Sequence, residues 1–218
     1  KHVAERAEQN IPPLPLDADQ TSELIELLKK DHQESDFLLN LLKERVPAGV
    51  DQAAYVKAAF LADITTGKAS SPYITKIDAV KILGTMLGGY NIQPLIECLK
   101  DNELAEAAAH VLSRTLLIFD AFNEIFELSK TNEHAKKVVE EWANATWFTE
   151  KTDIEEQITL TVYKVTGEIN TDDLSPAPDA WSRPDIPLHA LAMFKMPRIG
   201  LDDPLGTIEK LKEKGNPL

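Results

Sequence analysis

The chain has 218 residues, of which 43% are hydrophobic and 27% are charged. This composition is ordinary for a water-soluble globular protein, and it excludes collagen-like and intrinsically disordered chains. The 36 acidic residues outnumber the 23 basic ones, and the formal net charge is -13. Because no run of lysine and arginine forms a stripe that could neutralise phosphates, direct binding to nucleic acid is not predicted. The length predicts one large domain or two unequal ones.

The sequence contains neither a predicted membrane span nor a recognisable signal peptide. Its longest apolar stretch, residues 111–119, is interrupted by polar side chains and is much shorter than the roughly 20 residues that cross a bilayer. Residues 1–6 lack the apolar core of a secretory signal. Cys98 is the single cysteine, which excludes an intrachain disulfide. We therefore expect a cytoplasmic protein without membrane contact.

Residues from about 17 to about 150 are predicted to be helical, because apolar residues recur every three or four positions. Asp17, with a glutamine three residues further on, forms a capping-box pattern ahead of an apolar run over residues 24–28. A second apolar stripe over residues 37–42 is ended by the proline and glycine of residues 47–49. Later helices are predicted over residues 53–61, 77–83, 92–96, 104–116, 119–128 and 135–142.

The helix over residues 104–116 has the most regular apolar period, and its small alanines would let a neighbouring helix approach closely. Asn132, after Thr131, is the predicted cap of the helix over residues 135–142. Seven to nine short helices with tight connections favour antiparallel pairs stacked as an α-solenoid, in the style of HEAT-like repeats. No sequence repeat is visible, so a compact irregular bundle is the alternative.

The pattern changes in the last part of the chain. Over residues 158–165 apolar and polar residues alternate, which predicts a strand that opens a second domain. A short helical stretch over residues 189–194 and a last helix over residues 208–214 follow it. A lone strand cannot pair both of its edges, so we expect this domain to be incomplete. The predicted division is a helical domain over residues 1–155 and an incomplete domain over residues 156–218.

The side chains that bind metals are too few and too scattered to predict a metal site. The histidines lie at positions 2, 32, 110, 134 and 189. None of their spacings suits a metal ion, and one cysteine cannot hold zinc or an iron-sulfur cluster. Cys98 lies on an apolar helical face and is expected to be buried. The glycines over residues 84–89 lack the lysine of a phosphate-binding loop, and they are expected to form a turn.

The segment from Asn170 to Arg183 is the most informative part of the sequence. It places hydroxyls, carboxylates and one arginine in a proline-rich loop directly after the predicted strand. Rigid scaffolds present polar side chains to ligands in this way. Asparagine, aspartate, serine and proline also dominate ordinary turns, so the residues alone leave a surface turn equally open.

Residues 170–177, with the sequence NTDDLSPA, resemble the Thr-Asp-x-x-Ser motif that opens the swivelling domain of the aconitase superfamily. The continuation over residues 181–185, WSRPD, is close to the B-type aconitases in particular. Residues 45–51 and 83–92 are similar to stretches of the helical domain in that family. The resemblance covers nearly the whole chain. It implies a mainly α fold, a HEAT-like α-α superhelix followed by the truncated start of an α/β swivelling domain.

The resemblance also implies an activity and a set of site residues. B-type aconitases convert citrate to isocitrate through cis-aconitate, and some dehydrate 2-methylisocitrate, with a [4Fe-4S] cluster as Lewis acid. The cluster cysteines of the family are absent here, so this chain would ligate no cluster and would not catalyse alone. By resemblance Arg183 binds a substrate carboxylate, while Thr171, Asp172 and Ser175 lie near the substrate. Asp173 departs from the His or Gln that many superfamily members have there.

The implied partners are a tricarboxylic acid substrate, the rest of the parent enzyme, and a second copy bound through the helical domain. Association with messenger RNA is known in the family, but the acidic charge balance of this chain does not predict it. A free-standing helical scaffold that binds proteins is the alternative, and it leaves residues 170–183 unexplained. An independent small enzyme would need a catalytic set that the sequence does not contain.

Overall fold

The computed structural model describes residues 2–8, 13–115, 118–150, 156–177, 179, 189–196 and 198–215. The chain divides into two compact units. The first, which we call the helical unit, comprises Leu16–Thr152. The second, the terminal unit, comprises Lys1–Pro15 and Asp153–Leu218. Over the described residues the secondary structure is helical, with isolated bridges in place of strands. This confirms the mainly α prediction.

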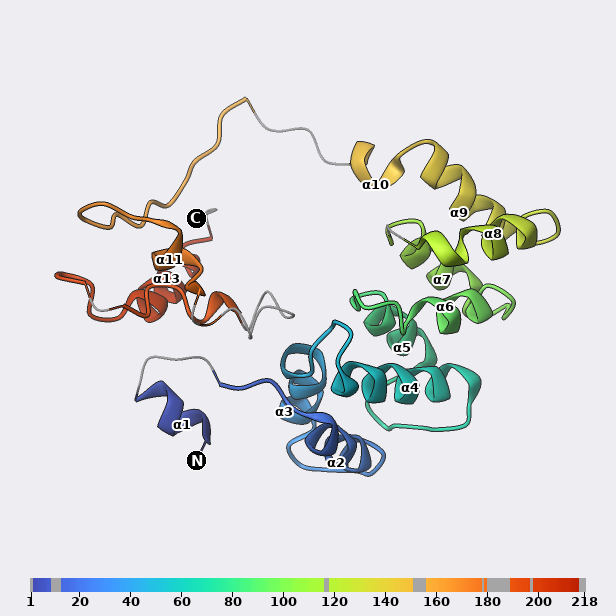
Figure 1. Cartoon of the computed structure of the whole chain (residues 1–218), viewed down its shortest axis with the longest axis horizontal. Helices are drawn as coiled ribbons and strands as arrows, with labels where there is room; N and C mark the ends of the chain where they lie inside the picture. The colour runs from blue at the N-terminus through green and yellow to red at the C-terminus, as the bar shows by residue number, and fades with distance from the viewer. Residues whose placement is uncertain are drawn as a thin grey trace. The chain divides into compact units, whose positions relative to one another are not determined.

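The helices of the helical unit follow one another with short connections (Figure 1). They are α2 (Ala18–Leu28), α3 (Ser35–Asn40), the π-helix η1 (Leu41–Arg45), α4 (Gln52–Thr66), α5 (Lys76–Leu83), α6 (Ile92–Cys98), α7 (Ala105–Leu112), α8 (Phe119–Leu128), α9 (Glu133–Ala143) and α10 (Thr146–Thr149). The terminal unit contains α1 (His2–Ala7), α11 (Thr171–Leu174) and α13 (Pro204–Lys212). None of these helices combines the length and the apolar character needed to cross a membrane.

Side-chain caps fix the starts of several helices where the sequence predicts them. The Asp17 carboxylate accepts a hydrogen bond from the Gln20 amide at 2.8 Å, and the Gln20 side chain accepts one from the Asp17 amide at 3.2 Å. The Asn132 side chain accepts from the Ala135 amide at 2.9 Å and also donates to the Leu99 carbonyl at 2.8 Å. Both predicted caps are confirmed, and each satisfies an amide that the helix leaves unpaired.

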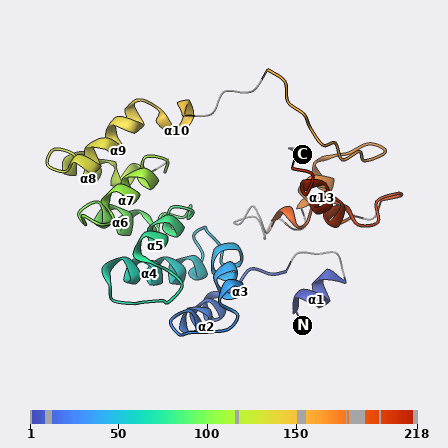
Figure 2. The same cartoon turned by 180° about the vertical axis from the view of Figure 1, so that it is seen from behind.

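Packing in the helical unit runs mainly between helices that are near neighbours in the chain. Helix α4 packs on α2 and α5, α7 packs on α5, α6 and α9, and α8 packs on α9. Figure 2 shows the same succession of helices from behind. Ala105, Ala108 and Ala109 of α7 are buried, as expected for the face of this helix that packs on its neighbours. One continuous apolar core runs through the unit, and Cys98 lies within it as predicted.

The turn between α5 and α6 is locked onto the loop that precedes α4. The Leu87 amide donates to the Ala48 carbonyl at 2.7 Å. A Cβ at Gly88 would lie only 2.0 Å from the Gly49 carbonyl oxygen, so this position has room for glycine alone. Asn91 is fully buried, and its amide nitrogen donates to the carbonyls of Leu83 and Met86 at 2.8 and 3.1 Å. The predicted glycine-rich turn is thus confirmed.

The terminal unit departs from the predicted strand. Residues 158–166 form no strand, and Ile158, Leu160 and Val162 are largely exposed. A strand forms only where a second strand pairs with its backbone groups. In the described residues of this unit the only strand-like pairing is the isolated bridge between Arg198 and Leu201. The predicted strand over residues 158–165 is therefore wrong for the structure of this chain.

Helical structure is present at both places where the sequence predicts it in this unit. The last helix, α13, begins at Pro204 and not at residue 208, because the Asp203 side chain accepts from the Gly206 amide at 3.0 Å and proline suits the first helical position. Residues 189–194 form a short helical turn, which ends at Phe194 with a positive φ of 56°.

We predict that Gly88→Ala lowers the free energy of unfolding of this chain by about 3 kcal/mol, because the new Cβ would collide with backbone that cannot move aside. Gly89→Ala is the matched control, since Gly89 has a φ of +90° but open space around it. That variant should lose about 1–2 kcal/mol through backbone strain alone. Urea denaturation measures both, and equal losses would contradict the collision.

We predict that Asn91→Ala lowers the free energy of unfolding by about 2–3 kcal/mol, because two buried carbonyls lose their donor. Asn144→Ala removes an exposed asparagine at the end of α9 and should change stability by less than about 0.5 kcal/mol. Thermal unfolding followed by circular dichroism would separate the two. A loss at Asn91 no greater than that at Asn144 would refute the role of its side chain.

Candidate functional site

The predicted site residues Thr171 and Asp172 occupy the first turn of α11. Asn170 caps this helix, and its side-chain oxygen accepts from the amides of Asp172 and Asp173 at 2.8 and 3.2 Å. The Asp173 carboxylate in turn accepts from the Asn170 amide at 2.9 Å, which completes a capping box. Thr171 and Asp172 are exposed. The cap therefore fixes the backbone from which both side chains project.

Ser175, the third predicted site residue, lies where α11 ends. Its amide donates to the Thr171 carbonyl at 2.7 Å, and its Oγ lies 3.0 Å from Nε2 of His189. Both side chains of this pair are half-buried. His189 was weighed only as a metal ligand from the sequence, and its contact with Ser175 was not predicted. Its position at the start of a predicted helical stretch, after the proline-rich loop, was the available signal.

The Asp172 carboxylate holds the loop that leaves α11. Its Oδ1 accepts from the Ala177 amide at 3.1 Å, which closes the chain back onto the helix over five residues. The structure therefore gives Asp172 a loop-fixing contact within its own chain. The predicted place of Asp172 near the substrate stays a prediction.

Two contacts hold the ends of the segment that contains Arg183. Asp179 is 2% exposed, and both of its carboxylate oxygens accept from Nζ of Lys195, at 3.0 and 2.9 Å. At the other end, His189 contacts Ser175. Arg183 itself lies outside the described residues, so its predicted contact with substrate stays a prediction. Lys195 was not singled out by the sequence analysis, because its partner lies 16 residues away.

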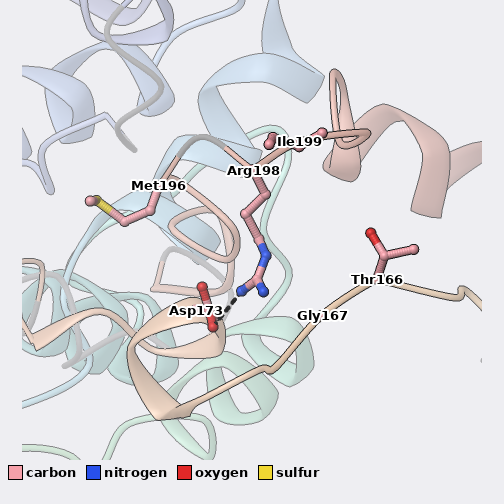
Figure 3. Close-up of a pocket in the computed structure, with 6 residues that line it drawn as sticks. All are labelled: Thr166, Gly167, Asp173, Met196, Arg198 and Ile199. Atoms are coloured by element: carbon pink, nitrogen blue, oxygen red, sulfur yellow. Dashed lines mark ion pairs between the residues drawn. The ribbon is translucent and has the colours of Figure 1, made fainter.

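An ion pair between Asp173 and Arg198 forms one side of a pocket of about 460 Å³ (Figure 3). Arg198 Nη1 lies 2.7 Å from Asp173 Oδ2, and the same guanidinium donates to the Glu168 carbonyl. The Asn170 amide and the Arg198 guanidinium together lower the pKa of the Asp173 carboxyl below its usual range. The pocket is lined by Thr166, Gly167, Asp173, Met196, Arg198 and Ile199.

Asp173 is thus a structural residue that joins α11 to the loop before α13. Its carboxylate supplies the anion that pairs with the Arg198 guanidinium. Arg198 was not predicted as a site residue, since nothing local to residue 198 indicates a partner 25 positions earlier.

The chain cannot hold an iron-sulfur cluster by itself. Such a cluster needs several cysteine thiolates, and Cys98 is the only cysteine in the sequence. Cys98 is buried in the helical unit, and burial raises the pKa of its thiol, which disfavours the thiolate. Among the described residues no group of His, Cys, Asp and Glu side chains is arranged to hold a metal ion.

Comparison with known proteins identifies the family. A profile described as the aconitate B N-terminal domain matches residues 1–148, and one described as the aconitate hydratase 2 N-terminus matches residues 160–218. Aconitate hydratase B of Escherichia coli strain K12 is 57% identical over 227 residues, which cover 100% of this chain and 26% of that protein. The corresponding proteins of Synechocystis sp. and Helicobacter pylori strain J99 are 56% and 47% identical, again over 100% of this chain and over 25% and 26% of their own lengths.

The chain therefore spans about a quarter of the length of the curated relatives it matches. The two profiles fall on either side of the change in pattern near residue 155, and the second includes the α11 motif and Arg183. This chain belongs to the aconitate hydratase B family, and it corresponds to the N-terminal portion of those proteins.

Proposed function

We propose that this chain acts as part of an aconitate hydratase that interconverts citrate and isocitrate through cis-aconitate, and that it is inactive alone. The observation that carries the proposal is the gathering of Thr171, Asp172 and Ser175 around α11, inside a chain matched over its whole length by proteins named aconitate hydratase B. We also propose that the parent enzyme dehydrates 2-methylisocitrate as a second reaction. The parent enzyme would work in the cytoplasm.

In this proposal the chain supplies substrate contacts. The planar guanidinium of Arg183 would hold a substrate carboxylate through two parallel hydrogen bonds. The hydroxyls of Thr171 and Ser175 would donate further hydrogen bonds, since carboxylates only accept them.

The [4Fe-4S] cluster would be held by the remainder of the parent enzyme, because this chain lacks the cysteines for it. No step that we assign to this chain passes through the cluster. The chain would bind and orient the substrate, while the bond-breaking chemistry would take place on groups supplied by the rest of the enzyme.

The helical unit would form a HEAT-like superhelix that covers the substrate channel and mediates self-association. Its serial packing, in which each helix mainly contacts near neighbours in the chain, supports the repeat-like architecture. Phe122 and Phe126 of α8 stack with ring centroids 6.1 Å apart and are each 44% exposed, which supports an interaction surface. If the chain were instead a free-standing scaffold that only binds proteins, the motif residues of α11 would have no functional explanation.

We predict that Arg183→Lys in the full-length parent lowers kcat/KM for citrate at least about tenfold, or about 1.4 kcal/mol of transition-state binding. Lysine keeps the charge but not the bidentate geometry. The assay is performed anaerobically with the cluster reconstituted. Arg114→Lys in the helical unit is the control, because Arg114 pairs with Glu141 and Glu150 and contacts none of the predicted site residues that the structure describes. Unchanged kinetics for Arg183→Lys would indicate that Arg183 belongs to a surface turn and does not bind substrate.

We predict that the parent enzyme and this 218-residue chain both show a dimer by light scattering at high concentration, because the proposed self-association surface lies in the helical unit. Dilution should shift both towards monomer. If only monomer is seen for the parent and for this chain across the concentration range, self-association through the helical unit is excluded.

A further inference from the structure

The Arg198 side chain contacts the chain on both sides of the point where α11 begins. Its Nη1 lies 2.7 Å from Oδ2 of Asp173, inside the helix, as the dashed line in Figure 3 shows. Its Nη2 donates to the carbonyl of Glu168, which lies two residues before the capping residue Asn170. One guanidinium therefore bridges residues 168 and 173, between which the chain enters the helix.

The arginine itself projects from a turn that is fixed by its own backbone. The Leu201 amide donates to the Arg198 carbonyl at 3.2 Å, and these two residues form an isolated antiparallel bridge. Helix α13 begins soon afterwards, at Pro204, with Asp203 as its cap. The side chains of Arg198 and Asp173 are only 19% and 11% exposed, so this ion pair is better shielded from water than an ordinary surface pair.

Helix α11 depends on support from outside because it is a single turn long. One helical turn is not stable by itself in water, since ordering its backbone costs more than its few hydrogen bonds return. The Asp173 carboxylate closes the capping box by accepting from the Asn170 amide at 2.9 Å. The oxygen that accepts there, Oδ2, is also the oxygen that faces Arg198. The ion pair therefore holds the carboxylate that closes the cap.

The predicted substrate contacts lie on this turn. Thr171 and Asp172 are its first two residues, and Ser175 follows its end as the C-cap. Loss of the Arg198 cation would loosen the turn, and it would also leave Asp173 as an unpaired carboxylate next to Asp172. Two neighbouring negative charges repel an anionic ligand. Both effects act on a bound carboxylate through Asp173.

We infer that Arg198 is a positioning residue of the substrate site, which holds the turn of α11 through Asp173 and neutralises that carboxylate without itself binding the substrate. The inference rests on the proposed function, which places Thr171 and Ser175 at the substrate. It assigns a role to a residue that lies outside the Thr-Asp-x-x-Ser motif by more than twenty positions.

The test uses Arg198→Met, Arg198→Lys, Asp173→Asn and the double variant Asp173→Asn/Arg198→Met in the full-length parent. Methionine keeps much of the apolar stem without the charge, and asparagine keeps an acceptor for the Asn170 amide. KM and kcat are measured for citrate. Kd is measured by calorimetry for propane-1,2,3-tricarboxylate, which has three carboxylates and no hydroxyl to eliminate, so that binding is observed without turnover.

We expect Arg198→Met to raise KM and Kd about tenfold, with a smaller change in kcat, since a charged hydrogen bond that orders the site is lost. Arg198→Lys keeps the charge and should raise Kd at most about threefold. Asp173→Asn breaks the same ion pair, so the double variant should bind no worse than the weaker of the two single variants. Lys212→Met is the matched control, because it removes an exposed ion pair with Glu209 within α13, and it should leave both constants unchanged.

A wild-type Kd in folded Arg198→Met would overturn the inference. So would losses that multiply in the double variant, because they would mean that Arg198 binds the substrate directly. Circular dichroism establishes that each variant is folded, and if Arg198→Met does not fold, Arg198→Lys takes its place in the same comparison with Asp173→Asn. Failure of the proposed function is a separate outcome, since the wild-type parent would then lack aconitate hydratase activity.

Discussion

Asp173 holds together the segments that carry the candidate site. Its carboxylate closes the capping box of α11 and pairs with Arg198, while its carbonyl accepts from Phe194. Three stretches of chain, α11, the turn after His189 and the loop before α13, therefore meet at one residue. Hydrogen bonds to charged groups are among the stronger polar contacts. Asp173 is only 9% exposed, so water competes little for these contacts. Loss of its negative charge would release α11 and the loop at the same time.

Among its described residues the terminal unit buries few apolar side chains, so polar contacts matter more there. In the helical unit, buried leucines such as Leu61, Leu83 and Leu112 form a continuous core, and local caps add to a structure that burial already stabilises. In the terminal unit, Ile199 is 98% exposed and the alternating apolar residues near residue 160 pack on no sheet. The described part of the site is thus held by directional hydrogen bonds and by the ion pairs of Asp173 with Arg198 and of Asp179 with Lys195.

The parts of the structure that the sequence predicts are those set by local chemistry. The Asp17 capping box, the Asn132 cap and the buried Cys98 follow from residues within a few positions of one another or from a regular helical period. The strand near residue 160 was wrong because alternation describes a strand's faces and not the partner that its backbone requires. The contacts of Ser175 with His189 and of Asp173 with Arg198 were missed because the partners are 14 and 25 positions apart, and only the fold brings them together.

The charges of the described site residues limit how an anionic ligand could be held at this site. Arg198 is neutralised by Asp173 and Lys195 by Asp179, so these two cations offer no net charge to an anionic ligand. Asp172 is exposed and adds negative charge of its own, in a chain whose net charge is -13. A tricarboxylate bound at this site would therefore depend on Arg183 for charge and on hydroxyl donors for the rest.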